Sequence, residues 1–546
     1  MNILSEISGR LLRLPAPASR ELLVDRDMPV VMDDGVVLLA DRYAPPGTER
    51  APTVLVRSPY GRRGAFGFLF GRLVAERGLQ TVVQSVRGTF GSGGRFDPFN
   101  ERSDGLATLR WLRSQPWHAG RVGTIGPSYM GIVQWAIADE LDALAPSVTA
   151  SQFRGMAYGG GSIALDTALS WMLVLQVQEQ RLAPLLLAHG LRRTLPRVFE
   201  HVPIAELDER AFGSQVHFFR EWTEQMSPDS PYWAERDFSS AVGDVRAPVQ
   251  LVGGWYDIFL PWMVEDFHAL RDAGRRPQLI IGPWAHTAAG MTGASLRHGV
   301  GWLRAHLLGD RRMVSDAPVR VYVTGERRWR ELTDWPPPGT RERTLYLAPS
   351  GRLADAPPDA EPTRFRYDPA DPTPALGGAM MLEQRPVRDN RPLEARADVL
   401  TFTGDPLDRD VDALGPVHAD IRFRSSRGDT DVFVRVCDVQ PDGASLNVCD
   451  GLIRLTPDEP ARDGDGIAAV RFELWPAGHR FHAGHRIRVQ VSSGAHPRYA
   501  RNPGTGEDPI HATRLLAADQ EVFHDPRRPS SVTLTVMPAH GVGSRL

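Results

Sequence analysis

The stretch that decides the fold is Gly126-Pro127-Ser128-Tyr129-Met130-Gly131. It follows the β-rich run 122–125 and precedes residues 129–139, whose apolar spacing predicts a helix. A serine on a tight turn between a strand and a helix is the pattern of a nucleophile elbow, which lifts the hydroxyl above the end of a sheet. The second glycine comes one residue later than in the usual G-x-S-x-G pattern, with Met130 in its place. An ordinary strand-to-helix turn that contains a serine therefore stays open as the alternative.

A serine hydroxyl becomes a nucleophile beside a base, so a histidine and an orienting carboxylate are needed elsewhere in the chain. Segment 249–257 predicts a strand that ends at Asp257, and segment 278–286 predicts a strand followed by His286. Taken alone, the aspartate is typical of a turn or helix N-cap, and the histidine of a solvated loop. Both follow Ser128 in the chain order Ser, Asp, His, and the carboxyl ends of parallel strands meet at one edge of a sheet. The three residues therefore predict a catalytic triad of nucleophile, orienting carboxylate and base.

Strands alternate with helices on both sides of this stretch, which predicts a mostly parallel sheet covered on both faces. The Asp33-Asp34-Gly35 turn between β-rich runs predicts a hairpin near the start of the sheet. The alternation stops near Pro146, where helical spacing takes over, and resumes before residue 249. After Trp335-Pro336-Pro337-Pro338 the chain shows short strands separated by Pro, Gly and Asp, a pattern typical of a β-sandwich or jelly roll. The expected segments are a core in two parts, 1–147 and 245–342, a helical cap insertion, 148–244, and a jelly-roll domain, 343–546.

The composition is that of an ordinary globular protein, with 42% hydrophobic and 24% charged residues. The net charge of −3 and the scattered positions of the arginines give no reason to expect nucleic acid or an anionic membrane as a partner. Cys437 and Cys449 have no histidine cluster of metal-ligand spacing nearby, so a zinc site is not expected. Residues 1–20 carry charges within their apolar stretch, and no long apolar run occurs elsewhere. Neither a signal peptide nor a membrane span is therefore expected, and the expected location is the cytoplasm.

These motifs together resemble the cocaine-esterase-like (CocE/NonD) hydrolases. That group is related to X-Pro dipeptidyl-peptidases, α-amino-acid ester hydrolases and glutaryl-cephalosporin acylases. The resemblance lies in G-x-S-Y-x-G around Ser128, in Gly-Trp-Tyr-Asp ending at Asp257 and in Gly-Pro-Trp-x-His ending at His286. It extends over nearly the whole chain, through Arg57-Ser58-Pro59-Tyr60, Val86-Arg87-Gly88, Trp111, Gln115-Pro116-Trp117, Asp334-Trp335-Pro336, Gly484-His485-Arg486-Ile487-Arg488-Val489 and Val491-Ser492-Ser493. Two positions depart from the family's pattern, Ser85 and Ala107, where the family often has acidic residues; both concern the support of loops rather than the triad.

The resemblance implies an α/β-hydrolase core with a helical cap insertion, followed by a C-terminal β jelly-roll domain. It also implies an oxyanion hole made by the backbone N–H of Tyr129 and the hydroxyl of Tyr60. Two preorganised donors are what the oxygen of a tetrahedral intermediate requires. The chemistry needs no metal or organic cofactor. His479 and His485, in the C-terminal part, are interpreted as structural rather than catalytic.

The residues after Asp257 bear on the substrate. In the α-amino-acid ester hydrolases a Glu-Asp pair follows the catalytic aspartate, whereas here Ile258-Phe259-Leu260-Pro261-Trp262 is wholly apolar. Burying an ammonium group there without a partner would be costly, so Phe259 is expected to line a pocket for an uncharged acyl group. Trp171 in the insertion aligns in context with an aromatic residue that lines the acyl site of the cocaine esterase; a buried packing role is the alternative.

The predicted function is hydrolysis of carboxylic esters of uncharged acyl groups through an acyl-enzyme. An X-Pro dipeptidyl-peptidase, or an amide or β-lactam side-chain acylase, would use the same triad and stays open, as does a non-catalytic binding protein. The expected partner is a small-molecule ester or amide, with no nucleic acid and no membrane. A homodimer stays open, and the sequence does not specify the natural acyl or alcohol group.

Overall fold

The computed structural model describes residues 3–47 and 50–538, so the outer ends of the expected segments 1–147 and 343–546 lie outside the described residues. The chain forms two compact units. The first comprises the chain up to Arg154 together with Leu175–Ala183 and Gln225–Arg320, and the second comprises Gly155–Val174, Pro184–Glu224 and the chain from Val321 onward. The four expected segments stay a prediction.

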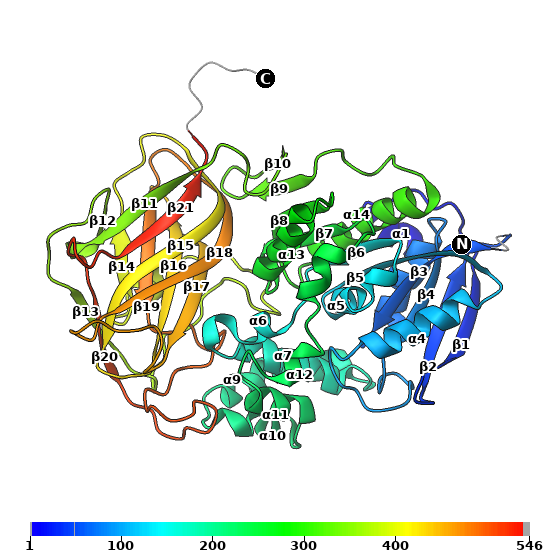
Figure 1. Cartoon of the computed structure of the whole chain (residues 1–546), viewed down its shortest axis with the longest axis horizontal. Coiled ribbons are helices and arrows are strands. Elements are labelled where there is room, and N and C mark those ends of the chain that lie inside the picture. The colour runs from blue at the N-terminus through cyan, green and yellow to red at the C-terminus, as the bar shows by residue number, and fades with distance from the viewer. Residues whose placement is uncertain (1–2, 48–49, 539–546) are drawn as a thin grey trace, which may run out of the picture. The chain divides into compact units, whose positions relative to one another are not determined.

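A mixed sheet forms the centre of the first unit (Figure 1). Its strands from β1 to β8 lie in the order β1-β2-β4-β3-β5-β6-β7-β8, and β9 and β10 follow β8 in the same order. β2 is antiparallel to β1 and β4, and the neighbouring strands from β4 to β8 are parallel. The predicted hairpin is confirmed, because Val31 pairs with Val37 across the turn. The strands are β1 (Leu23–Val31), β2 (Val37–Ala44), β3 (Ala51–Ser58), β4 (Gln80–Ser85), β5 (His118–Pro127), β6 (Ala143–Ser147), β7 (Gln250–Tyr256) and β8 (Gln278–Ala285).

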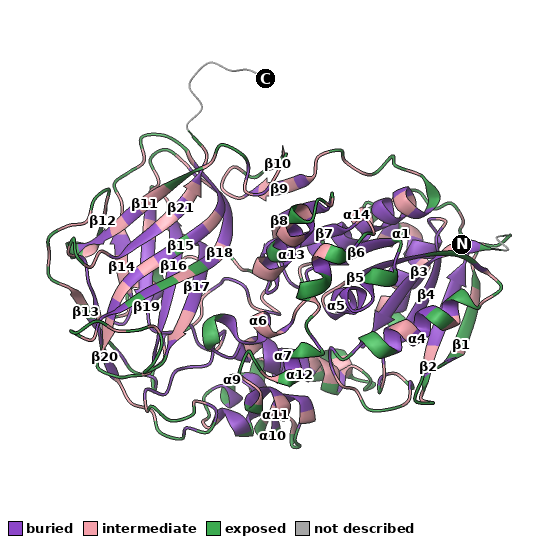
Figure 2. Cartoon of the chain, in the orientation of Figure 1, coloured by how far each residue is buried: buried purple, intermediate pink, exposed green. Residues whose placement is uncertain are grey.

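The central strands of this sheet are buried on both faces. Every residue of β4 and β7 is buried (Figure 2), as expected for parallel strands covered by helices. The helix α14 packs closely on β5 at Gly123, where there is no room for a side chain: a Cβ at this position would lie 2.7 Å from Leu303 Cδ2. With its mostly parallel, covered sheet, the unit is the expected α/β-hydrolase core. Its helices are α1 (Ile3–Leu11), α2 (Gly64–Phe66), α3 (Leu73–Ala75), α4 (Arg102–Arg113), α5 (Tyr129–Trp135), α12 (Pro231–Ala234), α13 (Leu260–Asp272) and α14 (Ala289–Leu308), with the π-helical segment η1 (Gly67–Arg72) and the 3₁₀ segments η2 (Ala138–Glu140) and η6 (Ser239–Asp244).

The insertion between β6 and β7 is helical, as its sequence predicts. Most of it belongs to the second unit, where Ser162 Oγ donates to the Ala500 carbonyl at 3.0 Å and Ala205 N donates to the Ile510 carbonyl at 3.0 Å. The insertion therefore contacts the segment of the second unit that contains Ala500 and Ile510. Its helices are α6 (Arg154–Ala157), α7 (Leu165–Val177), α8 (Ala183–His189), α9 (Leu195–Val198), α10 (Leu207–Phe212) and α11 (His217–Glu224), with η3 (Gly159–Gly161), η4 (Gly190–Thr194) and η5 (Ile204–Glu206).

The rest of the second unit is a β domain, mostly antiparallel, built around its own apolar core. Along β18 buried and exposed residues alternate over much of the strand, so one face meets the core and the other meets solvent. The strands in this part of the chain are β9 (Val319–Val323), β10 (Arg328–Leu332), β11 (Arg341–Ala348), β12 (Arg352–Ala354), β13 (Thr363–Tyr367), β14 (Leu400–Thr403), β15 (Val411–Ser425), β16 (Thr430–Val439), β17 (Ser445–Leu455), β18 (Ala468–Phe481), β19 (Arg486–Ser492), β20 (Ala518–Val522) and β21 (Ser531–Val536), with η7 (Pro349–Gly351) and α15 (Arg391–Glu394).

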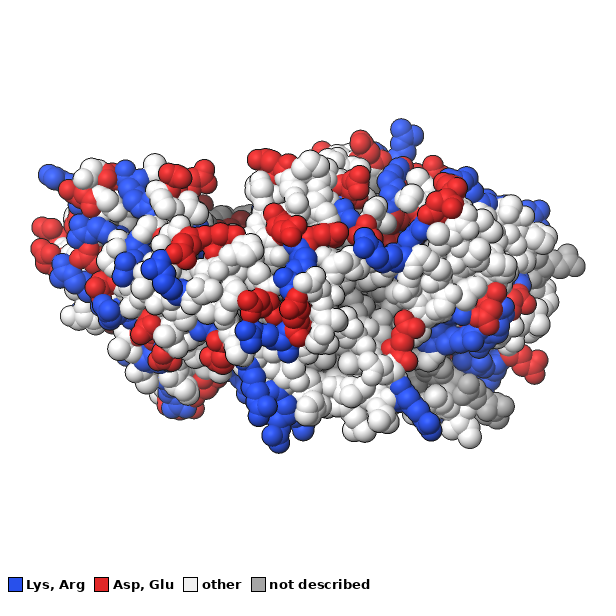
Figure 3. All heavy atoms as spheres, turned by 90° about the horizontal axis from the view of Figure 1, so that it is seen from below, with Lys and Arg blue, Asp and Glu red and all other residues white. Residues whose placement is uncertain are grey.

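Charged side chains of both signs are interspersed on the face drawn in Figure 3. Exposed arginines pair with carboxylates, as in Arg102–Asp139 at 2.8 Å and Arg113–Glu140 at 2.8 Å. Such exposed pairs contribute at most about 1 kcal/mol each, so they serve solubility more than stability. Within residues 3–47 and 50–538, no helix has both the length and the apolar character needed to cross a membrane.

Candidate active site

Ser128 lies on the sharp turn between β5 and α5. Its backbone has φ +57° and ψ −127°, a conformation that non-glycine residues rarely adopt. Strand β6 stabilises the turn: the Ser128 N–H donates a hydrogen bond to the carbonyl of Ser147, at the end of β6, at 2.9 Å. The side chain is half-buried, whereas Tyr129 and Met130 after it are fully buried. The elbow predicted from the sequence is thus present, with its hydroxyl at the carboxyl end of the sheet.

The irregular glycine spacing has a packing explanation. Gly126 makes room for the helix, since a Cβ there would lie 2.5 Å from Met130 Cβ. Gly131 makes room for a different neighbour, since its Cβ would lie 2.3 Å from Thr149 Cγ2. Met130 fills the core of the unit and is 1% exposed. The second glycine comes late because α5 approaches the segment after β6 closely at Gly131, whereas position 130 faces an apolar core.

A bulge between β7 and β8 brings the predicted aspartate and histidine together. Gly254 pairs with Gly282, but Tyr256 pairs with Ala285, so β8 contains one extra residue at this point. The next residues beyond that pair are Asp257 and His286. The bulge fits because Gly254 has no side chain: a Cβ there would lie 2.2 Å from the Trp284 carbonyl oxygen. Without the shift, the aspartate would be aligned with Ala285 instead of the histidine.

The three predicted residues form a continuous hydrogen-bonded chain. His286 Nδ1 lies 2.6 Å from Asp257 Oδ1, and His286 Nε2 lies 3.0 Å from Ser128 Oγ. The other carboxylate oxygen of Asp257 accepts the Phe259 N–H at 3.2 Å. Asp257 is fully buried and His286 is 7% exposed, so the carboxylate depends on these partners. A proton on Nδ1 directed at Asp257 leaves Nε2 able to accept the proton of the serine hydroxyl.

The two expected oxyanion donors lie at the same edge of the sheet as the serine. Tyr60 follows the carboxyl end of β3, is half-buried and stacks on Phe66 with ring centroids 5.0 Å apart. Tyr129 is the first residue of α5, directly after Ser128. The N–H groups of a first helical turn point out of the helix end and attract negative charge. The structure therefore places both donors next to strand ends that converge on the elbow, and their roles stay proposals.

The buried residue Glu101, which precedes α4, is part of the site's support and was missed by the sequence analysis. One of its carboxylate oxygens accepts a hydrogen bond from the Tyr129 hydroxyl, and the other lies 2.8 Å from Arg57 Nη2. Arg57 also donates to the Gln84 side chain at 2.9 Å. Burial raises the pKa of Glu101, and burial together with Glu101 raises the pKa of Tyr129 well above its ordinary value. Because a glutamate before a helix looks like an ordinary cap, the sequence offers no signal for this role.

The expected substrate-binding residues lie in different units. Phe259 is 3% exposed, and its ring centroid lies 5.8 Å from that of His286. Trp171 belongs to the second unit, where it stacks on Trp222 with centroids 6.0 Å apart and also contacts Phe218 at 5.7 Å. These contacts fit a packing role for Trp171 within the insertion. A role of either residue in binding substrate stays a prediction.

Within residues 3–47 and 50–538, no group of three or more His, Cys, Asp and Glu side chains could hold a metal ion. Cys437 and Cys449 are both free and buried, and burial raises the pKa of Cys437 to about 12. A thiol of that pKa stays protonated at neutral pH and is a poor ligand or nucleophile.

Comparison with known proteins shows which families the chain is similar to. Residues 34–288 match the family model of the X-Pro dipeptidyl-peptidases of the S15 family. Residues 313–533 match that of the X-Pro dipeptidyl-peptidase C-terminal non-catalytic domain. The cocaine esterase of Rhodococcus sp. (strain MB1 Bresler) is 29% identical over 562 residues, which cover 93% of this chain and 97% of that protein.

Solved structures show the same fold. An α-amino acid ester hydrolase matches with a TM-score of 0.80 at 23% identity, over 96% of this chain and 98% of that one. A CocE/NonD family hydrolase from Staphylococcus aureus matches with a TM-score of 0.69 at 16% identity, over 95% of this chain and 94% of that one. Together with the two family models, these matches extend over nearly the full length of the chain. The chain is therefore a serine hydrolase that is similar over nearly its full length to the cocaine esterase, with an S15-type region followed by a region of the X-Pro dipeptidyl-peptidase C-terminal type.

Proposed function

We propose that the protein hydrolyses carboxylic esters of uncharged acyl groups by a Ser-His-Asp acyl-enzyme mechanism. The observation that carries this proposal is the chain of hydrogen bonds from Asp257 through His286 to Ser128, with distances of 2.6 and 3.0 Å. The relative named cocaine esterase supports an ester as substrate.

In the first step, Ser128 Oγ attacks the ester carbonyl carbon while His286 Nε2 takes the hydroxyl proton. Asp257 stabilises the imidazolium that forms and keeps the ring in the required orientation. The tetrahedral intermediate collapses to an acyl-enzyme when His286 passes the proton to the leaving alkoxide, which departs as the alcohol. In the second step, His286 deprotonates a water that attacks the acyl-enzyme, and the protonated ring returns the proton to Ser128 as the acid leaves.

The negative oxygen of both tetrahedral intermediates is stabilised by two donors, the Tyr129 N–H and the Tyr60 hydroxyl. Donors fixed in advance lose little energy to reorganisation, and removing one typically costs about 10² to 10³ in kcat. Tyr129 is well suited to this role because its ring is locked: it is 2% exposed, and its hydroxyl binds Glu101.

The preference for an uncharged acyl group follows from the residues after Asp257. Ile258, Phe259 and Leu260 are apolar and at most 5% exposed. A substrate ammonium placed against them would lose its hydration without gaining a carboxylate partner. An X-Pro dipeptidyl-peptidase, or an amide or β-lactam side-chain acylase, uses the same triad and is the second candidate, favoured by the S15 family match.

Other features stay predictions from the sequence. These are a cytoplasmic location, a jelly-roll topology for the C-terminal β domain, and action on small molecules without nucleic acid or membrane. A role for Trp171 in lining the acyl site belongs with them. A homodimer stays open.

The proposal is tested by steady-state kinetics on matched substrates. We expect p-nitrophenyl butyrate to be hydrolysed with a kcat/KM well above that of alanine p-nitrophenyl ester and of alanyl-proline p-nitroanilide. Ser128→Ala should lower kcat on the butyrate by at least about 10⁴-fold. A faster reaction with alanyl-proline p-nitroanilide would favour the peptidase alternative. An unchanged rate in Ser128→Ala would exclude the proposed nucleophile.

A further inference from the structure

The aromatic ring of Phe90, from another loop, packs against the loop that carries Tyr60. Gly61, the next residue, has φ +89°, and a Cβ on it would lie 2.9 Å from two ring atoms of Phe90. The Phe90 ring therefore lies directly against the backbone beside Tyr60. On the other side of Tyr60 along the chain, the Pro59 carbonyl accepts a hydrogen bond from Gln178 Nε2 at 3.0 Å. The backbone of Tyr60 is thus held between a hydrogen bond and an aromatic ring.

Phe90 is itself fixed at both of its backbone polar groups. Its N–H donates to Glu179 Oε1 at 3.0 Å, and its carbonyl accepts a hydrogen bond from Arg62 Nη1 at 2.6 Å. Its φ of +47° lies in the left-handed region, which a phenylalanine adopts only when its surroundings impose it. Arg62 follows Tyr60 by two residues, so this bond ties the Tyr60 loop back to the ring that closes it.

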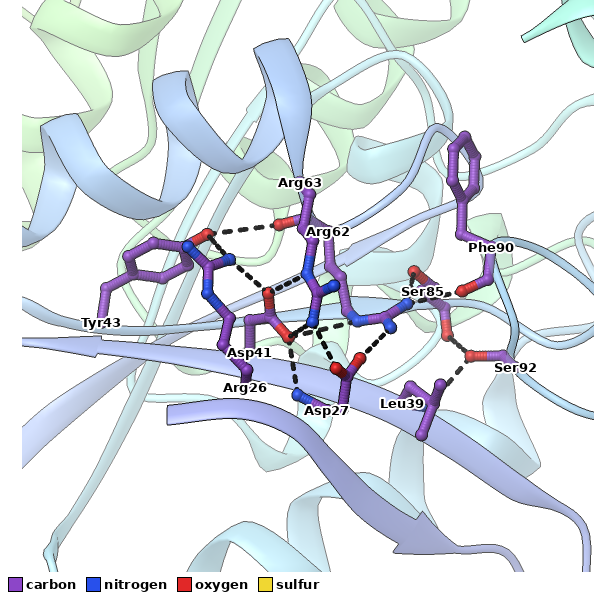
Figure 4. Close-up of polar contacts among 10 residues, drawn as sticks. All are labelled: Arg26, Asp27, Leu39, Asp41, Tyr43, Arg62, Arg63, Ser85, Phe90 and Ser92. Atoms are coloured by element: carbon purple, nitrogen blue, oxygen red, sulfur yellow. Dashed lines mark hydrogen bonds and ion pairs between the residues drawn. The ribbon is translucent and has the colours of Figure 1, made fainter. Parts of the chain in front are cut away.

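Arg62 is held in turn by a cluster of charged and polar groups (Figure 4). Its Nε lies 3.2 Å from Asp41 Oδ1, its Nη1 lies 3.2 Å from Ser85 Oγ, and its Nη2 pairs with Asp27. The Arg62 side chain is 7% exposed and that of Asp41 is fully buried. Ser85, one of the two departures from the family's pattern, thus contributes a hydroxyl to this cluster.

Asp41 is the fixed negative charge at the centre of the cluster. Burial raises its pKa, but hydrogen bonds from Arg63, the Asp27 N–H and Arg26 hold that pKa below its ordinary value. The carboxylate is therefore ionised at neutral pH. Arg63 shares both carboxylates with Arg62, at 2.9 Å from Asp41 Oδ2 and 2.5 Å from Asp27 Oδ2.

The two neighbouring arginines differ in their exposure and in the bonds that they make beyond the two carboxylates. Arg63 is 48% exposed and pairs with the two carboxylates. Arg62 pairs with the same carboxylates and in addition donates to the carbonyl of Phe90. The hydrogen bond from Arg62 to the Phe90 carbonyl is not needed to neutralise the charge of Asp41. It fixes the backbone of Phe90 and thereby holds the Phe90 ring against Gly61.

We propose that Arg62, anchored by Asp41, is a positioning residue that sets the Tyr60 hydroxyl for catalysis by holding Phe90 against Gly61. This inference rests on the proposed role of Tyr60 as an oxyanion donor. A hydrogen-bond donor that is displaced by a fraction of an ångström stabilises the transition state much less, whereas substrate binding changes little. Loosening the Phe90 contact should therefore lower kcat and leave KM nearly unchanged.

The test is a double-mutant cycle on the full chain with p-nitrophenyl butyrate. Arg62→Lys keeps a positive charge beside Asp41 but cannot reach Asp41, Ser85 and Phe90 at once. We expect Arg62→Lys to lower kcat about 10-fold and Tyr60→Phe about 100-fold, each with KM within about two-fold. In the Tyr60→Phe background, Arg62→Lys should lower kcat by less than about two-fold, because the hydroxyl it positions is gone. Arg63→Gln is the matched control and should change kcat by less than about two-fold in both backgrounds.

Titration with a fluorophosphonate gives the fraction of competent serine, so that a loss of folded protein is not counted as a loss of kcat. If Arg62→Lys does not fold, Phe90→Leu replaces it, with the same expected dependence on Tyr60. Equal losses from Arg62→Lys with and without the Tyr60 hydroxyl would overturn the inference, as would an unchanged kcat in Arg62→Lys. If Tyr60→Phe itself left kcat unchanged, the oxyanion role of Tyr60 would fall, a result distinct from the failure of Arg62 alone.

Discussion

Each unit of the molecule contains a histidine that joins a buried aspartate to a hydroxyl group. In the first, His286 lies 2.6 Å from Asp257 and 3.0 Å from Ser128 Oγ. In the second, His479 Nε2 lies 3.2 Å from Asp438 and its Nδ1 lies 2.8 Å from Thr324 Oγ1. The same three chemical groups are thus connected twice in one chain.

The surroundings of the two hydroxyls differ. Ser128 lies on a strained turn at the start of α5, where the first N–H groups of the helix point out of its end and attract negative charge. Thr324 follows β9, and its Oγ1 lies 3.0 Å from the Gly478 carbonyl, a second acceptor for its proton. Asp438 is shared with a second imidazole, His485, at 2.8 Å. The elbow and the adjacent N–H groups therefore distinguish the first set from the second, and we propose that the first set, and not the second, provides a nucleophile.

The largest expected effect comes from replacing the two histidines. His286→Gln removes the base and should lower kcat on p-nitrophenyl butyrate by about 10⁴- to 10⁶-fold. His479→Gln should change kcat by less than about two-fold and lower the melting temperature instead, because it breaks two buried hydrogen bonds. Stopped assays with both variants, corrected for folded protein, compare the two directly. A comparable loss of kcat in His479→Gln would break the comparison.

Replacing each of the two aspartates should distinguish an effect on kcat from an effect on the stability of the fold. Asp257→Asn keeps the shape of the side chain but favours the wrong imidazole tautomer, so kcat should fall by about 10³- to 10⁴-fold with little change in melting temperature. Asp438→Asn should leave kcat unchanged and cost about 1 to 3 kcal/mol of unfolding free energy, because two imidazoles lose a charged partner. Kinetics and urea unfolding on the same preparations give both quantities. A rate loss in Asp438→Asn would mean that the second set of residues takes part in catalysis.

The smallest expected effect is a pH dependence confined to the second set. Burial raises the pKa of Asp438, but its bonds to His479 and His485 outweigh burial and hold that pKa below the ordinary 3.8. The unfolded state then binds the proton first as pH falls, so the stability from Asp438 is present above about pH 4 and lost below it. Between pH 5 and pH 3, the unfolding free energy of the wild type should fall more steeply than that of Asp438→Asn, as urea unfolding at each pH would show. Parallel curves for the two proteins would contradict this assignment.

The fold was predictable where local signals agree with tertiary packing. The Asp33-Asp34-Gly35 turn and the apolar runs of β3, β4 and β7 predict these elements directly. Strand β6, Ala143–Ser147, was not predicted, because Ala and Pro have low strand propensity. It forms a strand because β5 and β7 pair with it on both sides in the parallel sheet.

The positions of the three candidate triad residues were predictable for a different reason: each directly follows the end of a strand, in the chain order typical of this fold, and their catalytic roles stay a proposal. The bulge that aligns Asp257 with His286 was not predictable, because it depends on the fit of Trp284 against Gly254. Glu101 and Asp41 were missed because their partners come from distant segments, such as Tyr129 and Arg62. A buried ion pair is a property of the folded chain, and neither partner carries a distinctive local pattern.

The proposed role of Ser128 as the activated hydroxyl is tested by treating the protein with a fluorophosphonate probe and mapping the modified peptide by mass spectrometry. We expect covalent labelling of Ser128, labelling slowed by at least about 10³-fold in His286→Gln, and unchanged labelling in His479→Gln. Labelling at Thr324 or at another serine, or the same labelling rate in Ser128→Ala, would contradict it.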